Sequence, residues 1–302
     1  MNIESIVLAA GKGTRMKSTE IPKVMHEIAA YPMLGWIIET LSSFSHAVNV
    51  VVGYKKEKVV EFCRTIKNTN INISVQEKQD GTGGAVREAL ASVNEKSDYF
   101  LITAGDVPLI KEETLKKFID IASGKKLALI STELDDPGQF GRLIRKKNGS
   151  VSRIVEYSDA DKEQKKIKEI NSGIYLVERN FLEYAISMIE NRNAKNEYYL
   201  TDIVEIAEKN NVSVLAYMEE DSVSLAGVNN RYQLAVADSH MQKRIKRKLM
   251  ESGVTMRLPD TIYIEKNARI YSGAELNPGC FIKSDAVIKS DAVIEANSVI
   301  NS

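Results

Sequence analysis

The chain of 302 residues has few cysteines, no excess of either charge and no long apolar run. Its two cysteines, Cys63 and Cys280, lie far apart, which argues against a disulfide framework and against a thiolate metal site. We therefore expect both to be small buried hydrophobic side chains. Because 41 basic residues balance 41 acidic ones, no global field draws the protein to nucleic acid or to an anionic membrane.

Signals for a membrane or for export are also missing. No stretch reaches the roughly 18 consecutive apolar residues of a spanning helix, and "MNIESIVLAA" has no basic segment ahead of its short apolar run. The sequence therefore predicts a cytoplasmic protein without a membrane partner. Histidine is scarce as well, and we assign the role of a general base to neither His26 nor His46.

Short β-rich runs alternate with helical patterns over the first 122 residues. Strands are expected at 5–10, 49–53, 71–76 and 99–105, and helices at 33–44, 55–66, 83–93 and 112–122. This alternation predicts a doubly wound α/β domain, with a mostly parallel, Rossmann-like sheet between two layers of helices.

From about residue 127 the alternation loosens, and the sheet is expected to become mixed. The segment "KKNGS" is typical of a hairpin tip, and helical patterns return at 179–190 and 200–210. Residues 230–252 then predict one long helix with a basic cluster, which we interpret as a solvated face rather than a surface for nucleic acid.

The C-terminal part has a period of its own. Aliphatic residues recur every six positions, at Ile264, Ile270, Leu276, Ile282, Ile288, Ile294 and Ile300. Such a period predicts a parallel β-helix, in which equivalent side chains stack on the same inner corner. The visible repeats supply about two coils, so the last coil is expected to lie uncovered.

The loop after the first strand, "LAAGKGTRMKSTEIPKVMH" at 8–26, fits neither the Walker A nor the dinucleotide fingerprint. Gly11 and Gly13 nevertheless allow backbone N–H groups to approach a phosphate. Three cations of the same stretch add positive charge: Lys12, Arg15 and Lys23. The loop therefore predicts a site for a triphosphate or pyrophosphate, with a plain glycine turn as the alternative.

Two further motifs point to a nucleotide. The segment "AGDVPL" ends a strand, so Asp106 should lie at the same sheet edge, where it can hold Mg²⁺ or merely cap the next turn. In "VQEKQDGTGGA", the Gln76 amide offers a donor and an acceptor to the imide edge of a pyrimidine, while Gly81 lets the backbone approach the ring.

Nine motifs occur in an order typical of one enzyme family: "LAAGKGTRM", "PKVMH", "QDGTGGA", "GDVPLI", "DDPGQFGR", "IVEYSDA", "EINSGIYL", "EYYLTDI" and "AGVNNR". The chain thus resembles the uridylyltransferase half of the bacterial bifunctional enzyme that makes UDP-N-acetylglucosamine, followed by the start of its left-handed β-helix. The resemblance implies a nucleotidyltransferase domain at 1–229, a connecting helix at 230–252 and an incomplete hexapeptide β-helix at 253–302.

The same resemblance implies the site residues. Arg15, Lys23 and Asp106 are the expected catalytic residues, and Asp106 with Asn229 is expected to hold Mg²⁺. Residues that line the nucleotide are Leu8, Ala9, Ala10, Gly11 and Lys23; those around uracil and ribose are Gln76, Gly81, Thr82, Ala104 and Gly105. The amino sugar is expected at Gly141, Glu156, Asn171, Tyr199 and Thr201.

The implied reaction transfers UMP from UTP to N-acetylglucosamine-1-phosphate and releases pyrophosphate. The alternatives are another sugar-1-phosphate nucleotidyltransferase and a catalytically silent regulatory subunit. Two positions depart from the family, since Ala104 is smaller than usual and Gly84 replaces a common histidine. Acetyl transfer is not expected, because His240, the last histidine, precedes the first hexad. The family trimerises through its β-helix, and we expect a weakened trimer or a monomer.

Overall fold

A computed structural model describes residues 1–301 and divides the chain into two compact units. The first unit consists of Met1–Met25 and Leu34–Gly227. The second consists of His26–Met33 and the chain from Val228 onward. Each unit has its own hydrophobic core, and we describe the two separately.

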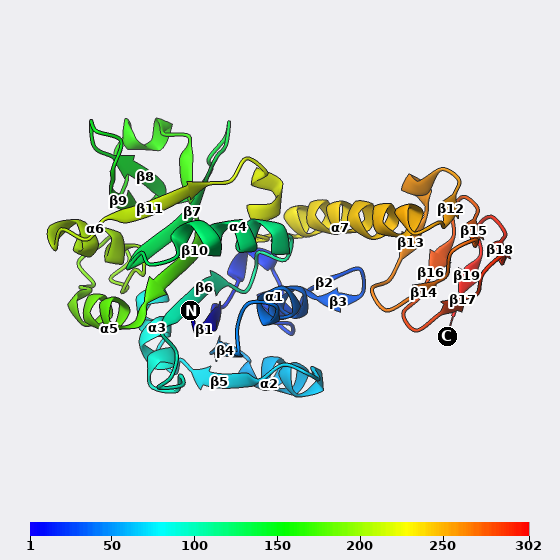
Figure 1. Ribbon diagram of the computed structural model, residues 1–302, viewed down its shortest axis with the longest axis horizontal. Helices are drawn as coiled ribbons and strands as arrows, with labels where there is room; N and C mark the ends of the chain where they lie inside the picture. Colours follow the sequence, from blue (N-terminus) through cyan, green and yellow to red (C-terminus); the bar gives the residue numbers. More distant parts are fainter. Residues whose placement is uncertain (302) are drawn as a thin grey trace. The chain divides into compact units, whose positions relative to one another are not determined.

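The first unit is built on a sheet of nine strands, whose main path runs β11-β7-β10-β6-β1-β4-β5 (Figure 1). The pairs β6-β1, β1-β4, β4-β5 and β7-β11 are parallel, whereas β10 is antiparallel to both β6 and β7. The sheet is therefore mostly parallel and becomes mixed after residue 127, as predicted. The strands of this path are β1 Ile3–Ala9, β4 Ala47–Val52, β5 Ile71–Val75, β6 Tyr99–Ala104, β7 Leu127–Glu133, β10 Glu169–Glu178 and β11 Val214–Met218.

Helices cover both faces of this sheet. Side chains alternate along each strand, so that Val7 packs into one core and its neighbour Ile6 into the other. One core also contains side chains of α1 Met33–Ser42, α2 Lys56–Thr65 and α4 Glu112–Ala122. The other contains those of α3 Thr82–Leu90, α5 Arg179–Met188 and α6 Asp202–Lys209. The doubly wound α/β prediction is confirmed.

A hairpin extends the mixed part of the sheet. Strands β8 Arg142–Arg145 and β9 Val151–Val155 pair with each other, and Lys146 N–H donates to Ser150 O at 2.8 Å across the tip. The tip thus lies at "KKNGS", as predicted. Strand β11 is absent from the sequence prediction, although Asn210 and Asn211 form a turn between it and α6.

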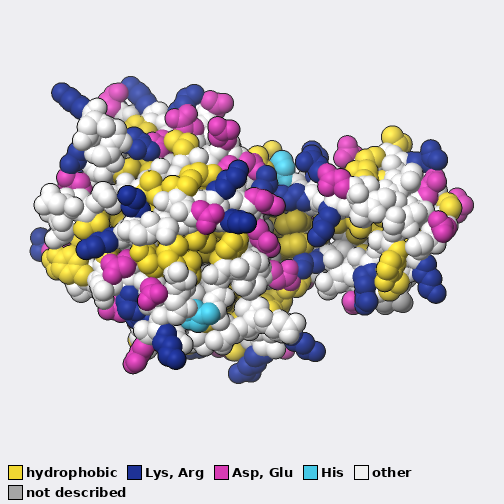
Figure 2. Space-filling view, in the orientation of Figure 1, with side chains coloured by type: hydrophobic (Ala, Val, Ile, Leu, Met, Phe, Trp, Pro, Cys, Tyr) yellow, Lys and Arg dark blue, Asp and Glu magenta, His cyan; other side chains and the backbone are white. Residues whose placement is uncertain are grey.

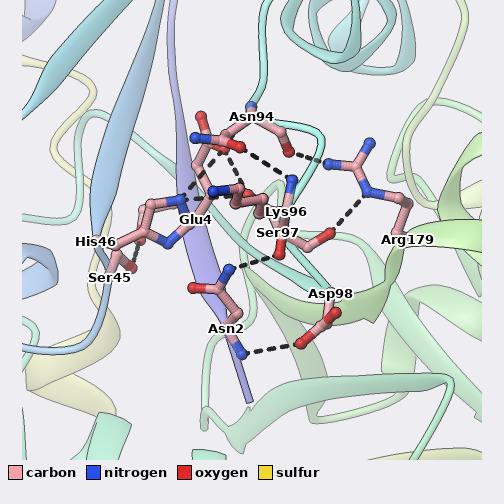
Figure 3. A network of polar contacts seen from close by, with 10 residues as sticks. Asn2, Glu4, Ser45, His46, Asn94, Lys96, Ser97, Asp98 and Arg179 are labelled. Carbon is pink, nitrogen blue, oxygen red and sulfur yellow. Dashed lines mark hydrogen bonds and ion pairs between the residues drawn. The ribbon is translucent and has the colours of Figure 1, made fainter.

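A polar network fastens the amino-terminal edge of the sheet (Figure 3). The buried Glu4 on β1 accepts hydrogen bonds from Asn94 N–H at 2.9 Å and from Ser97 Oγ at 2.8 Å. From the start of α5, Arg179 Nε donates to Ser97 O at 2.7 Å. These contacts hold the turn before β6 in place, so the sheet is anchored at the edge opposite the candidate site.

The second unit combines a long helix, α7 Arg231–Glu251, with stacked short strands. Arg269 pairs in parallel with Val287, three hexads farther along, as Phe281 does with Val299. The predicted parallel β-helix is therefore confirmed, and three hexads make one coil. Its strands are β12 Thr255–Met256, β13 Tyr263–Ile264, β14 Arg269–Ile270, β15 Glu275–Leu276, β16 Phe281–Ile282, β17 Val287–Ile288, β18 Val293–Ile294 and β19 Val299–Ile300.

Lys246 corrects the prediction of a wholly solvated basic face on α7. This side chain is buried, and its Nζ donates to Pro259 O at 2.6 Å and to Ile262 O at 3.1 Å. Burial lowers the pKa of the Lys246 ammonium. The two carbonyl groups accept hydrogen bonds from the buried Lys246 ammonium, whereas the sequence predicts that this lysine is solvated like its neighbours.

A short hairpin in the second unit is absent from the sequence prediction. Strands β2 Glu27–Ile28 and β3 Tyr31–Pro32 are joined by Ala29 and Ala30, whose φ angles of 52° and 57° are left-handed. Alanine rarely adopts this conformation, so no turn signal is present. Two contacts hold the turn: Ala29 N–H donates to Asp238 Oδ1 at 2.7 Å, and Lys266 N–H donates to Ala29 O at 2.9 Å.

The surface charges agree with the balanced composition of the chain. Basic and acidic side chains are interspersed on the face seen in Figure 2. Within residues 1–301, no helix combines the length and apolarity needed to cross a bilayer. Cys63 and Cys280 are both buried, as predicted, and burial raises the pKa of the Cys63 thiol to about 12.

Candidate functional site

The carboxyl ends of β1 and β6 form the base of the candidate site. These strands are parallel neighbours, with Leu8 opposite Ala104. Gly105 N–H donates to Leu8 O at 2.9 Å, and a Cβ at Gly105 would lie 3.0 Å from Val24 Cγ1. The chain therefore stays tightly packed just past the strand end. This is the edge where open α/β sheets bind ligands.

The glycine loop follows β1 directly. Gly13 has a left-handed φ of 59°, and a Cβ there would lie only 2.5 Å from Lys23 Cβ. A glycine at this position thus allows the Lys23 backbone to pass close to the loop. At Gly11, by contrast, a Cβ would meet no atom within 4 Å, so the space beside its backbone is open to a ligand.

Lys23 and Asp106 meet at this edge. Lys23 lies on the short 3-10 helix Lys23–Met25, and Asp106 follows β6 by two residues. The Lys23 ammonium forms an ion pair with the Asp106 carboxylate, and the two side chains are 18% and 12% exposed. A phosphate that enters can share the ammonium, which frees carboxylate lone pairs for a cation.

Arg15 contacts a residue outside the predicted set of site residues. Its Nη1 donates to Gln139 Oε1 at 3.2 Å, so the glycine loop meets the "DDPGQFGR" loop. The buried Arg142 shapes that second loop, because its Nη2 donates to Gly138 O at 2.9 Å and its Nη1 to Phe140 O. Burial lowers the pKa of the Arg142 guanidinium.

The loop before α3 holds Gln76 in a defined orientation. Gln76 is buried at the end of β5, and its Nε2 donates to Gly81 O at 2.9 Å and to Asp80 Oδ1 at 3.1 Å. Gly81 has a φ of 114°, and a Cβ there would lie 2.5 Å from Tyr198 O. Any larger residue at position 81 would therefore clash with the backbone of another segment.

The same loop is fastened to the segment that carries Tyr199 and Thr201. Tyr198 N–H donates to Asp80 O at 2.7 Å, and Gly83 N–H donates to Tyr198 O at 2.7 Å. Thr82 Oγ1 accepts a hydrogen bond from Leu200 N–H at 2.9 Å. The Thr82 side chain thus joins the two segments, and its contact with a base stays a prediction.

The residues expected to bind an amino sugar lie near one another. Thr201 Oγ1 donates to Glu156 Oε1 at 3.3 Å, and a Cβ at Gly141 would lie 3.3 Å from that same oxygen. Gly141 O accepts from Asn171 N–H at 3.0 Å, and Asn171 Nδ2 donates to Tyr175 Oη at 2.6 Å. The structure therefore places Gly141 and Thr201 beside the Glu156 carboxylate, and the Asn171 backbone is joined to Gly141.

A cavity of about 610 Å³ lies beside this group, lined in part by Glu156, Tyr199, Thr201 and Asp202. Burial raises the pKa of the Glu156 carboxyl. Burial, together with the nearby charges of Glu205 and Glu156, raises the pKa of Asp202 to about 6. The cavity wall is therefore rich in acceptor oxygens, which suit the hydroxyl and amide donors of a sugar.

Asn229 belongs to the second unit, where it precedes α7 and its N–H donates to Gln233 Oε1 at 2.8 Å. Its pairing with Asp106 around a metal stays a prediction. Within residues 1–301, no group of three or more His, Cys, Asp or Glu side chains is arranged to hold a metal ion. A cation at Asp106 would therefore take most of its ligands from a bound phosphate, a donor set that fits Mg²⁺.

Two residues of the site were missed by sequence reasoning although they stand inside quoted motifs. Gln139 contacts Arg15, and Asp80 contacts Gln76. Both motifs draw attention through their glycines, and neither polar residue carries a spacing signal of its own. The two histidines considered earlier lie elsewhere: His26 is buried in the second unit, and His46 belongs to the network at the opposite sheet edge.

The chain is similar to known proteins over most of its length. Residues 5–170 match the family model of the MobA-like NTP transferase domain. The bifunctional protein GlmU of Geobacter metallireducens is 41% identical over 282 residues, which cover 92% of this chain and 58% of the relative. GlmU of Thermoanaerobacter pseudethanolicus is 42% identical over 279 residues, covering 91% and 60%. GlmU of Nitrosococcus oceani is 37% identical over 300 residues, covering 93% and 65%.

The chain thus spans roughly three fifths of the length of these curated relatives. The matched region contains the glycine loop, the strand end at Asp106, Gln76 and Glu156. Family match and site geometry agree on a doubly wound sheet with a phosphate loop after its first strand, and the chain belongs to the MobA-like NTP transferase family.

Proposed function

We propose that this protein transfers UMP from UTP to N-acetylglucosamine-1-phosphate, giving UDP-N-acetylglucosamine and pyrophosphate. The observation that carries the proposal is the meeting of Lys23 and Asp106 at the edge that also bears the glycine loop. The similarity to bifunctional GlmU proteins supports the choice of substrates.

The reaction needs no activated side chain as nucleophile. A phosphate oxygen of the sugar phosphate attacks the α-phosphorus of UTP, and a new P–O bond forms as the bond to the β-phosphate oxygen breaks. Pyrophosphate leaves with that electron pair. Catalysis is then mainly positioning and stabilisation of charge, which is the task of Lys23 and Arg15 in this proposal.

Magnesium is the metal that we propose for the site, with Asp106 and Asn229 as protein ligands. A bound Mg²⁺ supplies charge neutralisation for the nucleotide phosphates. The chain supports this choice because Asp106 is a single carboxylate at the strand end, and Mg²⁺ prefers few carboxylates with phosphate and water ligands, whereas Ca²⁺ takes more oxygen ligands.

The sugar specificity is proposed from the cluster around Glu156. A carboxylate that accepts from sugar hydroxyls can hold the ring beside the base loop, because the Tyr198 backbone joins that loop to the Tyr199 segment. An acceptor competition assay tests this proposal. Equal amounts of N-acetylglucosamine-1-phosphate and glucose-1-phosphate are offered with UTP, and the products are separated by mass; we expect the amino sugar nucleotide, and predominance of UDP-glucose would contradict the proposal.

A catalytically silent regulatory subunit is the competing proposal from another class. The ion pair of Lys23 and Asp106 and the open space beside the Gly11 backbone favour an enzyme. Calorimetric titration with UTP separates the two, because a silent subunit that has lost its nucleotide site would give no heat of binding.

For assembly, we retain the proposal of a weakened trimer or a monomer. Outward-facing Val287, Val293 and Val299 on the β-helix are each at least half exposed, so an apolar surface is present. Its small extent argues against a tight interface. Sedimentation over a hundredfold range of concentration tests this, and a trimer at every concentration would contradict it.

A further inference from the structure

The structure gives a physical reason for the absence of a side chain at Gly84. The residue lies inside α3, where glycine is otherwise unfavourable by about 1 kcal/mol relative to alanine. A Cβ at this position would lie 1.9 Å from Asp80 Oδ1 and 3.2 Å from Gln76 Nε2. The Asp80 carboxylate therefore occupies the space that any larger side chain at position 84 would need.

The Asp80 carboxylate has a second partner, the amide of Gln76. The two amide protons of Gln76 Nε2 go to Asp80 Oδ1 and to Gly81 O. Because both neighbours are acceptors, the reverse orientation of the amide would set oxygen against oxygen. Over residues 1–301, Gln76 Oε1 receives no hydrogen bond, so the amide presents an acceptor and no donor to a ligand.

We propose that Asp80 is a positioning residue for base selection, which fixes the Gln76 amide so that only Oε1 faces the base, and that Gly84 makes room for its carboxylate. The inference rests on the proposed function, which places a pyrimidine nucleotide beside Gln76. The ligand class that it selects is a base with an imide N–H. Uracil has that proton at N3, whereas N3 of cytosine is itself an acceptor and would face Oε1 unfavourably.

A comparison of UTP with CTP tests the role of Asp80. In Asp80→Ala only Gly81 O still holds the Gln76 Nε2 group, so the amide can turn more readily and offer a donor. The ratio of kcat/KM for UTP to that for CTP should then fall about tenfold, the scale of one hydrogen bond. Asp80→Asn keeps an acceptor oxygen and should retain most of the preference. A merely structural role would lower both nucleotides equally and leave the ratio unchanged, which would overturn the inference.

Gly84→Ala provides an independent variant of the same contact. Its added methyl group should displace the Asp80 carboxylate and reduce the UTP preference much as Asp80→Ala does. In an Asp80→Ala background the same methyl group should reduce the preference less than it does alone, because its remaining close contact is Gln76 Nε2 at 3.2 Å. Additive effects in the double variant would contradict a shared mechanism. Thermal unfolding of each variant shows whether the fold is kept.

Binding separates this inference from the proposed function. Calorimetry measures the affinity of each variant for UTP and CTP without any acceptor. If the unmutated protein prefers UTP and Asp80→Ala does not, the inference stands even where no sugar nucleotide is formed. If Asp80→Ala keeps the preference, the inference is overturned, whatever the turnover. If the unmutated protein does not prefer UTP, both the inference and the proposed donor are overturned.

Discussion

The Lys23 ammonium forms an ion pair with the Asp106 carboxylate, although the two residues lie 83 positions apart in the sequence. The parallel pairing of β1 with β6 explains this contact, because it brings the segments after both strands to one edge of the sheet. A cation and a carboxylate placed side by side can bind a phosphate and its counterion together.

Removing either partner of this pair should therefore reduce turnover. We expect Lys23→Ala and Asp106→Ala each to lower kcat by about 100-fold or more, the scale of losing one electrostatic stabiliser. Pyrophosphate release under saturating substrates is the measurement, and Lys67→Ala, an exposed lysine on the same unit, is the control. Full activity of Asp106→Ala would refute the metal assignment.

Glu156 is expected to act on substrate affinity rather than on turnover. Glu156→Gln keeps one accepting oxygen but loses the charge, so the KM for the sugar phosphate should rise about tenfold while kcat changes little. Initial rates at varied sugar phosphate and fixed UTP give both constants. Glu95→Gln, at an exposed position, controls for the loss of charge. An equal rise in the KM for UTP would argue against a sugar contact.

Arg142 is expected to stabilise the loop that carries Gln139. Arg142→Met removes a buried guanidinium that donates to the carbonyl groups of Gly138 and Phe140, which should lower the free energy of unfolding by about 2 kcal/mol. Urea denaturation measures this change. The matched variant Arg64→Met replaces an exposed arginine on α2 and should be nearly neutral. Equal stability of the two variants would show that the carbonyl contacts contribute little.

The raised pKa of Asp202 predicts a dependence of stability on pH. Its folded pKa of about 6 exceeds the ordinary value of 3.8, so the folded protein binds this proton more tightly than the unfolded chain does. The resulting stability is fully present below about pH 3.8 and is lost as the pH rises through about 6.

Asp202→Asn, which stays neutral, should therefore raise the Tm relative to the unmutated protein at pH 8, and raise it less at pH 5. Thermal unfolding at both pH values makes the comparison, and Asp120→Asn on the exposed side of α4 should show no such difference. An identical change of Tm at both pH values would mean that the carboxyl group titrates normally.

The sequence predicts those parts of the fold that depend on local periodicity. Alternating apolar runs locate β1, β4, β5 and β6, and the hexad period locates the coils of the β-helix. The hairpin at Ala29 and Ala30 escapes prediction because Asp238 and Lys266, far along the chain, hold its turn. Lys246 is likewise buried by carbonyl groups that no helical pattern reveals.

The sequence likewise predicts only part of the candidate site. Glycines with a defined strand before them are visible in the sequence, and the structure places Gly13 and Gly81 where a Cβ would clash. The partners of the polar side chains are not visible, because Gln139 reaches Arg15 only through the tertiary fold. Asp80 lies four residues from Gln76, yet its contact depends on the missing side chain at Gly84.

The most direct test of the proposed nucleotidyl transfer is ³¹P NMR of the reaction mixture. Protein, UTP, N-acetylglucosamine-1-phosphate and Mg²⁺ are mixed, and ³¹P NMR records the species formed over time. We expect UTP and the sugar phosphate to decline together while a nucleoside diphosphate sugar and pyrophosphate rise in equal amounts, and we expect Asp106→Ala to slow this change about 100-fold. Persistence of both substrates with the unmutated protein would contradict nucleotidyl transfer between these two compounds.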